Sequence, residues 1–154
     1  MSEQSGARVW ETPPQIREHI EAYLKDPEAA HLWDSGQPGA KGLLRTLLLT
    51  ATGRKSGELR HTPLAYGKSG DDYVVIASKA GFPSHPAWYL NLLAQPEAEI
   101  RVGAERMRVR ARTAEGEERD RLWAMMRDGY PPFDDYQARA GRREIPVVVL
   151  EPQR

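Results

Sequence analysis

The stretch LLRTLLLTATGRKSGELRHTPLAY, residues 43–66, decides the fold predicted for this chain. Its first part, residues 43–49, is a short apolar run, and residues 60–66 are rich in side chains that suit a β-strand. Between the two runs, Gly53 and Gly57 mark a loop. Two such runs joined by a short loop that contains glycine are typical of a β-hairpin. We therefore expect a strand, a loop and a second strand.

The loop of this hairpin has the composition of an anion site. Arg54 and Lys55 lie between the glycines, and Arg60 follows Gly57 by three positions. Glycine exposes backbone N–H groups to an anion, arginine offers a planar fork of donors and lysine a point charge. The loop is not a Walker P-loop, because the spacing from glycine to lysine is wrong and no helix pattern starts after Ser56. It is predicted to hold a phosphate; the alternative is a solvated turn with ordinary surface cations.

The composition limits the classes of function. The 154 residues suggest one domain with a sizeable core. The 22 basic and 22 acidic residues cancel, so no overall field favours a nucleic acid or an anionic membrane. The chain has no cysteine, which excludes disulfides, thiol catalysis and cysteine metal sites. No signal core and no run of about 20 apolar residues is present, so we expect a soluble cytoplasmic protein.

The N-terminal part has a helical pattern over residues 13–33. Ile16, Ile20, Tyr23 and Leu24 recur on one face, and a proline at position 27 divides two segments. The mixed charges favour packing of this amphipathic helix on the domain, with peripheral contact to a membrane as the alternative. The sequence SGQPGAKG at positions 35–42 is a loop by composition. We expect an N-terminal helical arm over residues 1–40 and a second unit over residues 41–154.

Short strand-like segments follow at near-regular spacing. We expect strands over residues 43–50, 60–67, 72–78, 98–102, 105–113 and 145–151, with turns at residues 67–72 and 103–104. Helices are expected over residues 87–93 and 115–127, the second with a core-facing apolar stripe made of Leu122, Trp123, Met125 and Met126. Most strands are linked by hairpins, which favours an antiparallel barrel over a parallel sheet. The predicted fold class is mainly β with helices (α+β).

A second segment that could form part of a binding site is ASKAGFPSHPAWYLNL, residues 77–92. After a strand and a flexible loop, Ser84 or His85 is placed to cap a helix, whose early proline suits the first turn. A helix N-terminus attracts anions, and Trp88 and Asn91 lie three positions apart on that helix. The segment predicts a wall for a flat ring. The alternative is that the tryptophan belongs to the core and the histidine only caps the helix.

A third segment is YPPFDDYQ, residues 130–137. Tyr130, Phe133 and Tyr136 keep a spacing of three residues around two prolines. Because two aspartates lie among them, we do not expect all three aromatic side chains in the deep core. One interpretation is an aromatic lid over the mouth of a pocket. The other is a loop that packs on the surface before the last strand.

The absence of other motifs narrows the chemistry. The four histidines, His19, His31, His61 and His85, show no i, i+4 pair and no His-x-His spacing, so we expect no metal site. The sequence has no Gly-x-Ser-x-Gly elbow, and no carboxylate pair stands out, so it does not support a hydrolase. A phosphate loop and an aromatic wall without evident acid–base groups suit a cofactor that does the chemistry while the protein positions it.

On these residues the chain resembles the deazaflavin-dependent nitroreductase family, whose members use coenzyme F420 on a split β-barrel related to flavin-binding folds. The resemblance covers roughly residues 40–152. Its matching motifs are LLLTATGRKSG at 47–57, Arg60 with TPL at 62–64, ASK at 77–79 with Gly81, HPAWYLNL at 85–92, YP at 130–131, YQ at 136–137 and IPVVVLEP at 145–152. It implies an FMN-binding-like split β-barrel that follows the N-terminal helical arm, and coenzyme F420 as the cofactor.

The resemblance also implies a set of site residues. The coenzyme would be bound by Arg54, Lys55, Ser56, Gly57, Arg60, Thr62, Pro63, Ala77, Ser78, Lys79, Pro86, Trp88, Tyr89 and Asn91. The arginines, the lysine of the loop and the N–H groups of Ser56 and Gly57 would face its phosphate and acidic tail. The acceptor would meet Ala65, Ser78, Tyr130, Phe133 and Tyr136. The family often has tyrosine at position 133, so one hydrogen bond is lost here.

The reaction that the resemblance implies is hydride transfer from reduced F420 (F420H2) to a quinone, an enone or a nitroaromatic compound. The catalytic candidates are Ser78, as a donor to the developing anion, and Tyr130 or Tyr136, which compete with water as the proton source. The alternatives are an FMN-dependent reductase on the same barrel and a non-catalytic F420 carrier, against which the aromatic mouth argues. The partner expected is a small-molecule electron acceptor and not a nucleic acid; the oligomeric state is left open.

Overall fold

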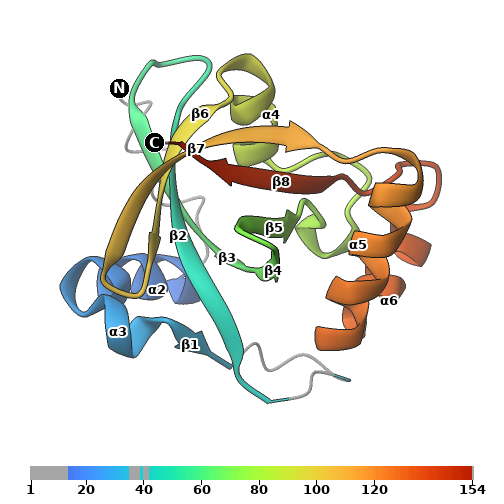
Figure 1. Ribbon diagram of the computed structural model, residues 1–154, viewed down its shortest axis with the longest axis horizontal. Helices are drawn as coiled ribbons and strands as arrows, with labels where there is room; N and C mark the ends of the chain where they lie inside the picture. Colours follow the sequence, from blue (N-terminus) through green and yellow to red (C-terminus); the bar gives the residue numbers. More distant parts are fainter. Residues whose placement is uncertain (1–13, 35–38, 40–41, 154) are drawn as a thin grey trace.

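The computed structural model describes residues 14–34, 39 and 42–153 (Figure 1). Its helices are α2 (Pro14–Lys25), α3 (Pro27–Ala30), α4 (Ala87–Ala94), α5 (Gly116–Gly129) and α6 (Pro132–Ala140), with a 3-10 turn η1 (Lys79–Gly81). Its strands are β1 (Leu32–Trp33), β2 (Leu44–Thr52), β3 (Leu59–Ala65), β4 (Gly67–Ser69), β5 (Asp72–Ile76), β6 (Glu97–Val102), β7 (Glu105–Thr113) and β8 (Val147–Pro152). The predicted helices over residues 87–93 and 115–127 are confirmed.

The strands form one curled antiparallel sheet in the order β1-β2-β6-β7-β8-β5-β4, with β3 paired to β2 (Figure 1). Hairpins join β2 to β3, β4 to β5 and β6 to β7. The longer connections run through α4 and through α5 and α6. The prediction of an antiparallel rather than a parallel sheet is confirmed.

The inner face of the curled sheet forms the first core. Leu47 and Leu49 alternate along β2 and meet Val75 of β5 and Ile100 of β6, all fully buried. Helix α4 closes this core with three buried side chains, Trp88, Tyr89 and Leu92. This packing fixes the N-terminus of α4 beside the β2–β3 hairpin.

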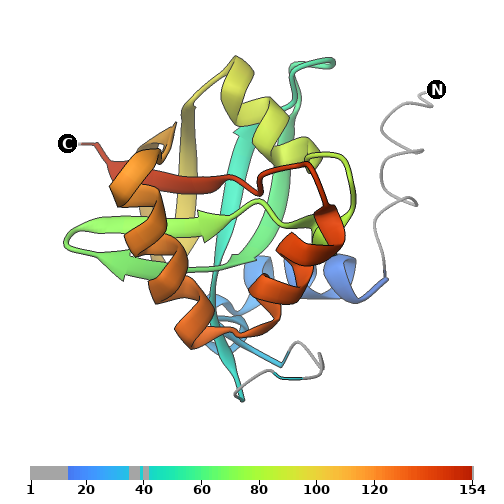
Figure 2. The same cartoon turned by 90° about the vertical axis from the view of Figure 1, so that its right-hand side faces the viewer.

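A second core lies on the other side of β5 and β8, under α5 and α6 (Figure 2). Val74 and Val149 point away from the first core and pack here, so both strands are buried on both faces. Burial on both faces explains the unbroken apolar run at residues 147–150. The predicted apolar stripe of α5 is confirmed: Leu122 and Met126 are buried, and the remaining two side chains, Trp123 and Met125, are partly buried.

The segment 130–137 is not a loop, and the expectation that its aromatic side chains cannot all be core is wrong. Helix α6 begins at Pro132, and its first turn holds two aspartates, which favour a helix N-terminus. Tyr130 lies just before α6, and its ring contacts those of Phe133 and Tyr136, which lie about one turn apart on the helix. The three side chains are 6%, 6% and 8% exposed. The aspartates lie on the exposed face. A surface loop therefore does not describe this segment, and the aromatic lid over the mouth of a pocket stays a prediction.

The N-terminal helices pack on the sheet through Tyr23. This side chain is fully buried against Leu48, and its hydroxyl donates to the carbonyl of Thr46 at 2.8 Å. Packing of the amphipathic helix on the domain, the interpretation that its charges favoured, is therefore confirmed. Leu24 is 45% exposed, so its assignment to the packed face is wrong, because adjacent helical residues point about 100° apart.

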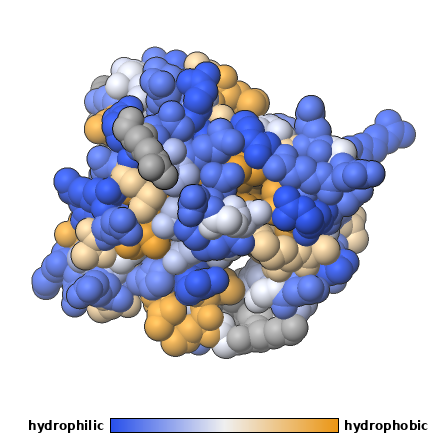
Figure 3. Space-filling view, viewed as in Figure 1, coloured by the Kyte–Doolittle hydropathy of each residue, from blue (hydrophilic) through white to orange (hydrophobic). Residues whose placement is uncertain are grey.

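The boundary between arm and barrel at residues 40 and 41 stays a prediction, and most of the predicted loop 35–42 lies outside the described residues. In the part of the chain that the structure describes, no helix is long and apolar enough to cross a membrane. The face in Figure 3 is mostly hydrophilic, with its apolar side chains in separate groups. The exposed large apolar side chains come from different segments: Leu24, Leu32, Leu43, Leu59, Phe82 and Leu93.

Several predicted boundaries shift by a few residues. The turn expected at residues 67–72 is mostly the β4–β5 hairpin, which turns at Gly70, where φ is +63°. Gly67 is the first residue of β4, and a Cβ there would lie 2.7 Å from the Met126 sulfur, so the strand packs closely on α5 at this point. The strand predicted over residues 72–78 ends at Ile76, since the chain then enters η1.

Candidate functional site

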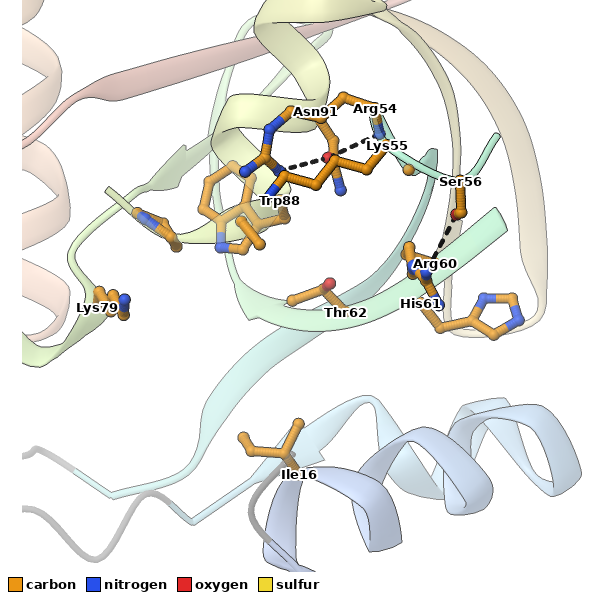
Figure 4. A pocket seen from close by; sticks show the side chains of 13 residues that line it. Ile16, Arg54, Lys55, Ser56, Arg60, His61, Thr62, Lys79, Trp88 and Asn91 are labelled. Carbon is orange, nitrogen blue, oxygen red and sulfur yellow. Dashed lines mark hydrogen bonds between the residues drawn. The ribbon is translucent and has the colours of Figure 1, made fainter. Parts of the chain in front are cut away.

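A cavity of about 600 Å³ opens where the β2–β3 loop, β3, η1 and the start of α4 meet, with Ile16 of α2 on the facing side (Figure 4). It brings together most of the residues expected to bind a coenzyme: Arg54, Lys55, Ser56, Arg60, Thr62, Lys79, Pro86, Trp88 and Asn91. These residues come from segments that are far apart in the sequence. The packing of α4 and β5 into the first core brings them to one place.

The β2–β3 loop is closed by its own backbone. The Gly53 N–H donates to the Glu58 carbonyl at 2.7 Å, and the Gly57 N–H donates to the Gly53 carbonyl at 2.8 Å. Gly57 has a φ of +76°, which favours glycine at this position. This N–H group already donates within the loop, and a contact from it to an anion stays a prediction.

Asn91 ties this loop to α4. Its side-chain oxygen Oδ1 accepts from the backbone N–H of Arg54 at 3.1 Å and from Nη1 of the same arginine at 2.9 Å (Figure 4). Asn91 is buried, whereas the guanidinium of Arg54 is exposed and lines the cavity. One buried amide oxygen thus orients a cation at the mouth of the cavity.

Arg60 is oriented from within the loop. Its Nη2 donates to Ser56 Oγ at 3.1 Å and lies 3.7 Å from Glu58 Oε1 (Figure 4). A Cβ on Gly53 would lie 3.2 Å from Nε of Arg60 and 3.1 Å from Ser56 Oγ. Both side chains therefore lie close to the backbone of Gly53. This crowding explains why glycine occupies the position although its φ is not positive.

The cavity is strongly cationic. Its lining carries four cationic side chains, Arg54, Lys55, Arg60 and Lys79, and no carboxylate among the residues that the structure describes. Lys79 lies at the other end from the hairpin cations (Figure 4), and its Nζ donates to Ser84 Oγ at 3.1 Å. A concave site lined by one sign of charge concentrates ligands of the opposite sign. The predicted phosphate site therefore has the charge that it needs.

The start of α4 differs from the prediction. Pro86 occupies the cap position and no side chain caps the helix, so the expected caps Ser84 and His85 are wrong. His85 Nδ1 instead accepts from Nη1 of Arg143 at 3.2 Å, because an arginine can only donate. Trp88 is 9% exposed and still lines the cavity, so it is both core and wall.

The remaining residues expected at the coenzyme do not line the cavity: Gly57, Pro63, Ala77, Ser78 and Tyr89. Ala77 is fully buried in the first core, and the Tyr89 hydroxyl lies 2.8 Å from Thr113 Oγ1. Ser78 is half-buried and directly precedes Lys79 in η1. Their direct roles at a ligand stay predictions.

A second cavity of about 380 Å³ lies between β3, β4 and α5. Ala65, Tyr130 and Phe133 line it, together with Met125 and Met126, but no residue lines both cavities. Tyr136 lines neither cavity.

The Tyr136 hydroxyl lies 3.0 Å from that of Tyr130, and the two share a hydrogen bond. Burial first, and then the bonded Tyr130 hydroxyl, raise the pKa of Tyr136 above its ordinary value. Three of the expected acceptor residues, Ala65, Tyr130 and Phe133, therefore line a different cavity from the cationic one.

Other residues at the first cavity were missed. Three of them lie inside or beside the recognised motifs, so their neighbours in the sequence already pointed to this site: Gly53, His61 and Ala87. Ile16 comes from the N-terminal helix, and only the packing of Tyr23 reveals its position. Arg143, beyond α6, donates to the backbone around η1, and no motif marks it.

His61 joins the rim of the cavity to the outer face of β2. Its Nδ1 lies 2.9 Å from Thr50 Oγ1. Burial, then the charge of Arg101, lower the pKa of His61, and Glu99 opposes them. No group of three or more histidine, aspartate or glutamate side chains that could hold a metal is found in the described part of the chain.

Comparison with known proteins identifies the family. A family model described as F420H(2)-dependent quinone reductase matches residues 18–152. The chain belongs to this family. An F420H(2)-dependent quinone reductase of Mycobacterium tuberculosis strain H37Rv is 43% identical over 132 residues, which are 82% of this chain and 88% of that protein. The predicted class, an F420-dependent oxidoreductase, is confirmed.

Solved structures agree with this assignment. A structure described as an F420-H2 dependent reductase, FDR-A, is 39% identical, with a TM-score of 0.64, over 69% of this chain and 93% of its own. HutZ of Vibrio cholerae, described as a heme storage protein, is 14% identical with a TM-score of 0.55, over 71% of this chain and 82% of its own, and shows the fold alone. The predicted FMN-binding-like split barrel is confirmed.

Proposed function

We propose that this chain catalyses hydride transfer from reduced coenzyme F420 to a quinone, with the coenzyme in the cationic cavity beside α4. The observation that carries the proposal is the meeting of four cationic side chains and Trp88 in one cavity, in a chain of the F420H(2)-dependent quinone reductase family. A phosphate-bearing anionic coenzyme with a flat ring needs both features. The experiment below tests this proposal against the carrier and the FMN-dependent reductase.

The residues fit such a coenzyme. Arg54 and Arg60 are held by Asn91 and Ser56, so their guanidinium groups are oriented before a phosphate arrives. Lys55 is exposed on the loop and adds a point charge. The bare backbone of Gly53 leaves room for this close arrangement. These contacts support phosphate at the hairpin end and the ring toward Trp88.

The protein's part in the reaction is orientation and charge stabilisation. When bound, reduced coenzyme F420 supplies the hydride. A quinone that accepts a hydride develops negative charge on oxygen, and the Lys79 ammonium and the Ser78 hydroxyl are our candidates to stabilise it. Lys79 lines the cavity and Ser78 is its neighbour in the chain.

The proton that completes reduction is proposed to come from water. The hydroxyls of Tyr130 and Tyr136 are bonded to each other and buried, and the raised pKa of Tyr136 makes it a weaker acid. The aromatic second cavity, lined by Ala65, Tyr130 and Phe133, is our candidate for the apolar part of the acceptor. A pocket for a second substrate would distinguish an enzyme from a carrier.

The first experiment is equilibrium binding of F420 and of FMN, followed through the tryptophan fluorescence of the protein, since Trp88 lines the cavity. We expect F420 to quench this fluorescence at lower concentrations than FMN. Lys55→Ala should raise the Kd for F420 about tenfold, as the loss of one charged contact predicts. The matched control is Lys68→Ala, which removes an exposed lysine at the second cavity.

Each outcome has a consequence. Tight F420 binding and turnover with a quinone would support the proposal, and binding without turnover would support the carrier. Preference for FMN would move the chain to the flavin alternative. Equal effects of Lys55→Ala and Lys68→Ala would remove the phosphate role of the hairpin loop.

A further inference from the structure

The turn at η1 holds an uncommon backbone conformation. Lys79 and Ala80 have φ values of +47° and +53°, and they are the non-glycine residues with positive φ in the described part of the chain. A non-glycine residue in this conformation is strained and persists only where its surroundings hold it. Lys79 also lines the cationic cavity. The elements that hold this turn therefore decide where that ammonium group can reach.

Arg143 holds the turn from outside. Its Nη2 donates to the Ser78 carbonyl at 2.6 Å, its Nη1 to the Ala77 carbonyl at 3.1 Å and its Nε to the Phe82 carbonyl at 2.9 Å. The Nη1 group also donates to His85. A single planar guanidinium thus spans the backbone on both sides of η1, which a lysine with one terminal nitrogen cannot do.

Helix α6 gives the turn a second support. Arg139 Nη1 donates to the Ala80 carbonyl at 2.9 Å, and η1 packs on α6. Gly81 packs directly against α6, where a Cβ on this residue would lie 2.6 Å from the Tyr136 carbonyl oxygen. The strained turn is therefore fixed from one side by α6 and the residues after it, while Lys79 faces the cavity.

We propose that Arg143 is a positioning residue of the coenzyme site, which acts by holding the η1 turn so that Lys79 is presented to the bound ligand. This inference rests on the proposed function. Arg143 does not line the cavity, so we propose no direct contact between it and the coenzyme. Its contribution passes through the backbone of residues 77–82.

The test measures F420 binding in the full chain. We expect Arg143→Ala to raise the Kd about tenfold, the effect of losing hydrogen bonds from a charged group, and Arg143→Lys to give an intermediate value. Two arginines are matched controls. Arg142→Ala removes the exposed neighbour, and Arg119→Ala removes a bond to the Ile145 carbonyl on the same C-terminal segment without touching η1. Both controls should keep the wild-type Kd.

A double-mutant cycle with Lys79→Ala separates positioning from general destabilisation. If Arg143 acts through Lys79, the two substitutions together should weaken binding by less than the product of their separate effects. Simple multiplication, or a wild-type Kd for Arg143→Ala, would overturn the proposal. Loss of affinity in Arg119→Ala equal to that in Arg143→Ala would also do so.

Amide exchange without ligand gives a readout that does not depend on the proposed function. The Gly81 and Phe82 N–H groups donate to Ser78 and Lys79 within the turn. Arg143→Ala should speed their exchange and leave that of the β2–β6 ladder unchanged. Unchanged exchange at these two amides would show that Arg143 does not hold the turn. If the wild-type chain bound no F420, the proposed function would be wrong. The exchange experiment would still show whether Arg143 holds the η1 turn.

Discussion

One buried oxygen, Oδ1 of Asn91, has a large part in shaping the cationic cavity. It accepts two hydrogen bonds from Arg54 and so joins the hairpin loop to α4. The oxygen is neutral, so it orients the guanidinium without cancelling its charge. A carboxylate in the same place would orient Arg54 equally well but would add a negative charge beside the expected phosphate.

This difference gives a prediction for Asn91→Asp. The carboxylate keeps both acceptor bonds, so the free energy of unfolding should fall by no more than about 1 kcal/mol. Affinity for F420 should fall about tenfold or more, because the new charge would repel an anion bound by Arg54. Urea unfolding and fluorescence titration measure the two effects.

Asn91→Ala is the companion variant to Asn91→Asp. It loses both bonds and should cost about 1 to 3 kcal/mol of stability as well as affinity. Wild-type affinity in the aspartate variant would mean that the anionic part of the coenzyme does not lie beside Asn91.

At this scale, the sequence predicted well the residues that act within one local motif. Arg54, Lys55 and Arg60 lie on one hairpin, so their meeting needed only the hairpin to form. The local pattern did not show that the Gly57 N–H donates to the Gly53 carbonyl, and the role of this group toward an anion stays a prediction. Arg143 could not be predicted, since its partners lie about sixty residues earlier in the chain.

The η1 turn and α6 show how one element supports another. The turn carries Lys79 to the cavity, and α6 supplies the surface on which Gly81 sits. The sequence indicated a flexible loop before α4, because glycine and proline dominate residues 81–86. Side-chain donors from α6 and beyond make that loop a fixed element instead.

Gly81→Ala tests the close packing of the η1 turn on α6. Gly81 has a φ of +81°, and its missing Cβ would meet the Tyr136 carbonyl at 2.6 Å and Arg139 Cβ at 2.9 Å. Backbone strain and overpacking together should lower the free energy of unfolding by about 2 to 5 kcal/mol. Gly70→Ala is the matched control, since Gly70 also has a positive φ but nothing lies within 4 Å of its Cβ position.

Gly70→Ala should cost only about 1 to 2 kcal/mol, the price of the left-handed conformation alone. Denaturant unfolding of the two variants and the wild type measures the difference. Equal losses in both variants would show that contact with α6 adds nothing to the turn.

The error over residues 130–137 belongs to the same scale. Prolines and aspartates indicated a loop, yet Pro132 and the aspartates are the residues that a helix N-terminus favours. The spacing of three between Tyr130, Phe133 and Tyr136 was itself a helical signal. Burial of all three could not be read locally, because it depends on β5 and β8 beneath them.

At the scale of the whole molecule, the two larger cores share a pair of strands, and a smaller cluster lies under the N-terminal helices. β5 and β8 are covered on both faces, by the curled sheet on one side and by α5 and α6 on the other. Strand spacing and hairpin turns sufficed to predict the antiparallel barrel. The place where the cavity opens follows from how α2, α4 and η1 close on it, which is a long-range property that no motif records.

We expect three histidines to make the stability of this arrangement depend on pH. Burial first, and then a neighbouring arginine, lower the pKa of His31, His61 and His85 below the ordinary value of 6.5. The arginines are Arg45, Arg101 and Arg143, in that order. The unfolded chain therefore binds protons more readily than the folded chain in the range just below pH 6.5, so acid favours unfolding there.

We expect the stability to be fully present above pH 6.5 and to fall as the pH passes below that value toward the lowered folded pKa values. Urea unfolding at about pH 7.5 and about pH 5.5 measures the fall, since most carboxylates remain ionised over this range. Replacing His31, His61 and His85 by glutamine should shrink the difference between the two pH values. Glutamine keeps a polar side chain of similar length but does not titrate, so the remaining slope reports the other groups. An unchanged slope in the triple variant would show that these histidines bind protons equally in the folded and unfolded chain, and that the arginines beside them do not disfavour their charge.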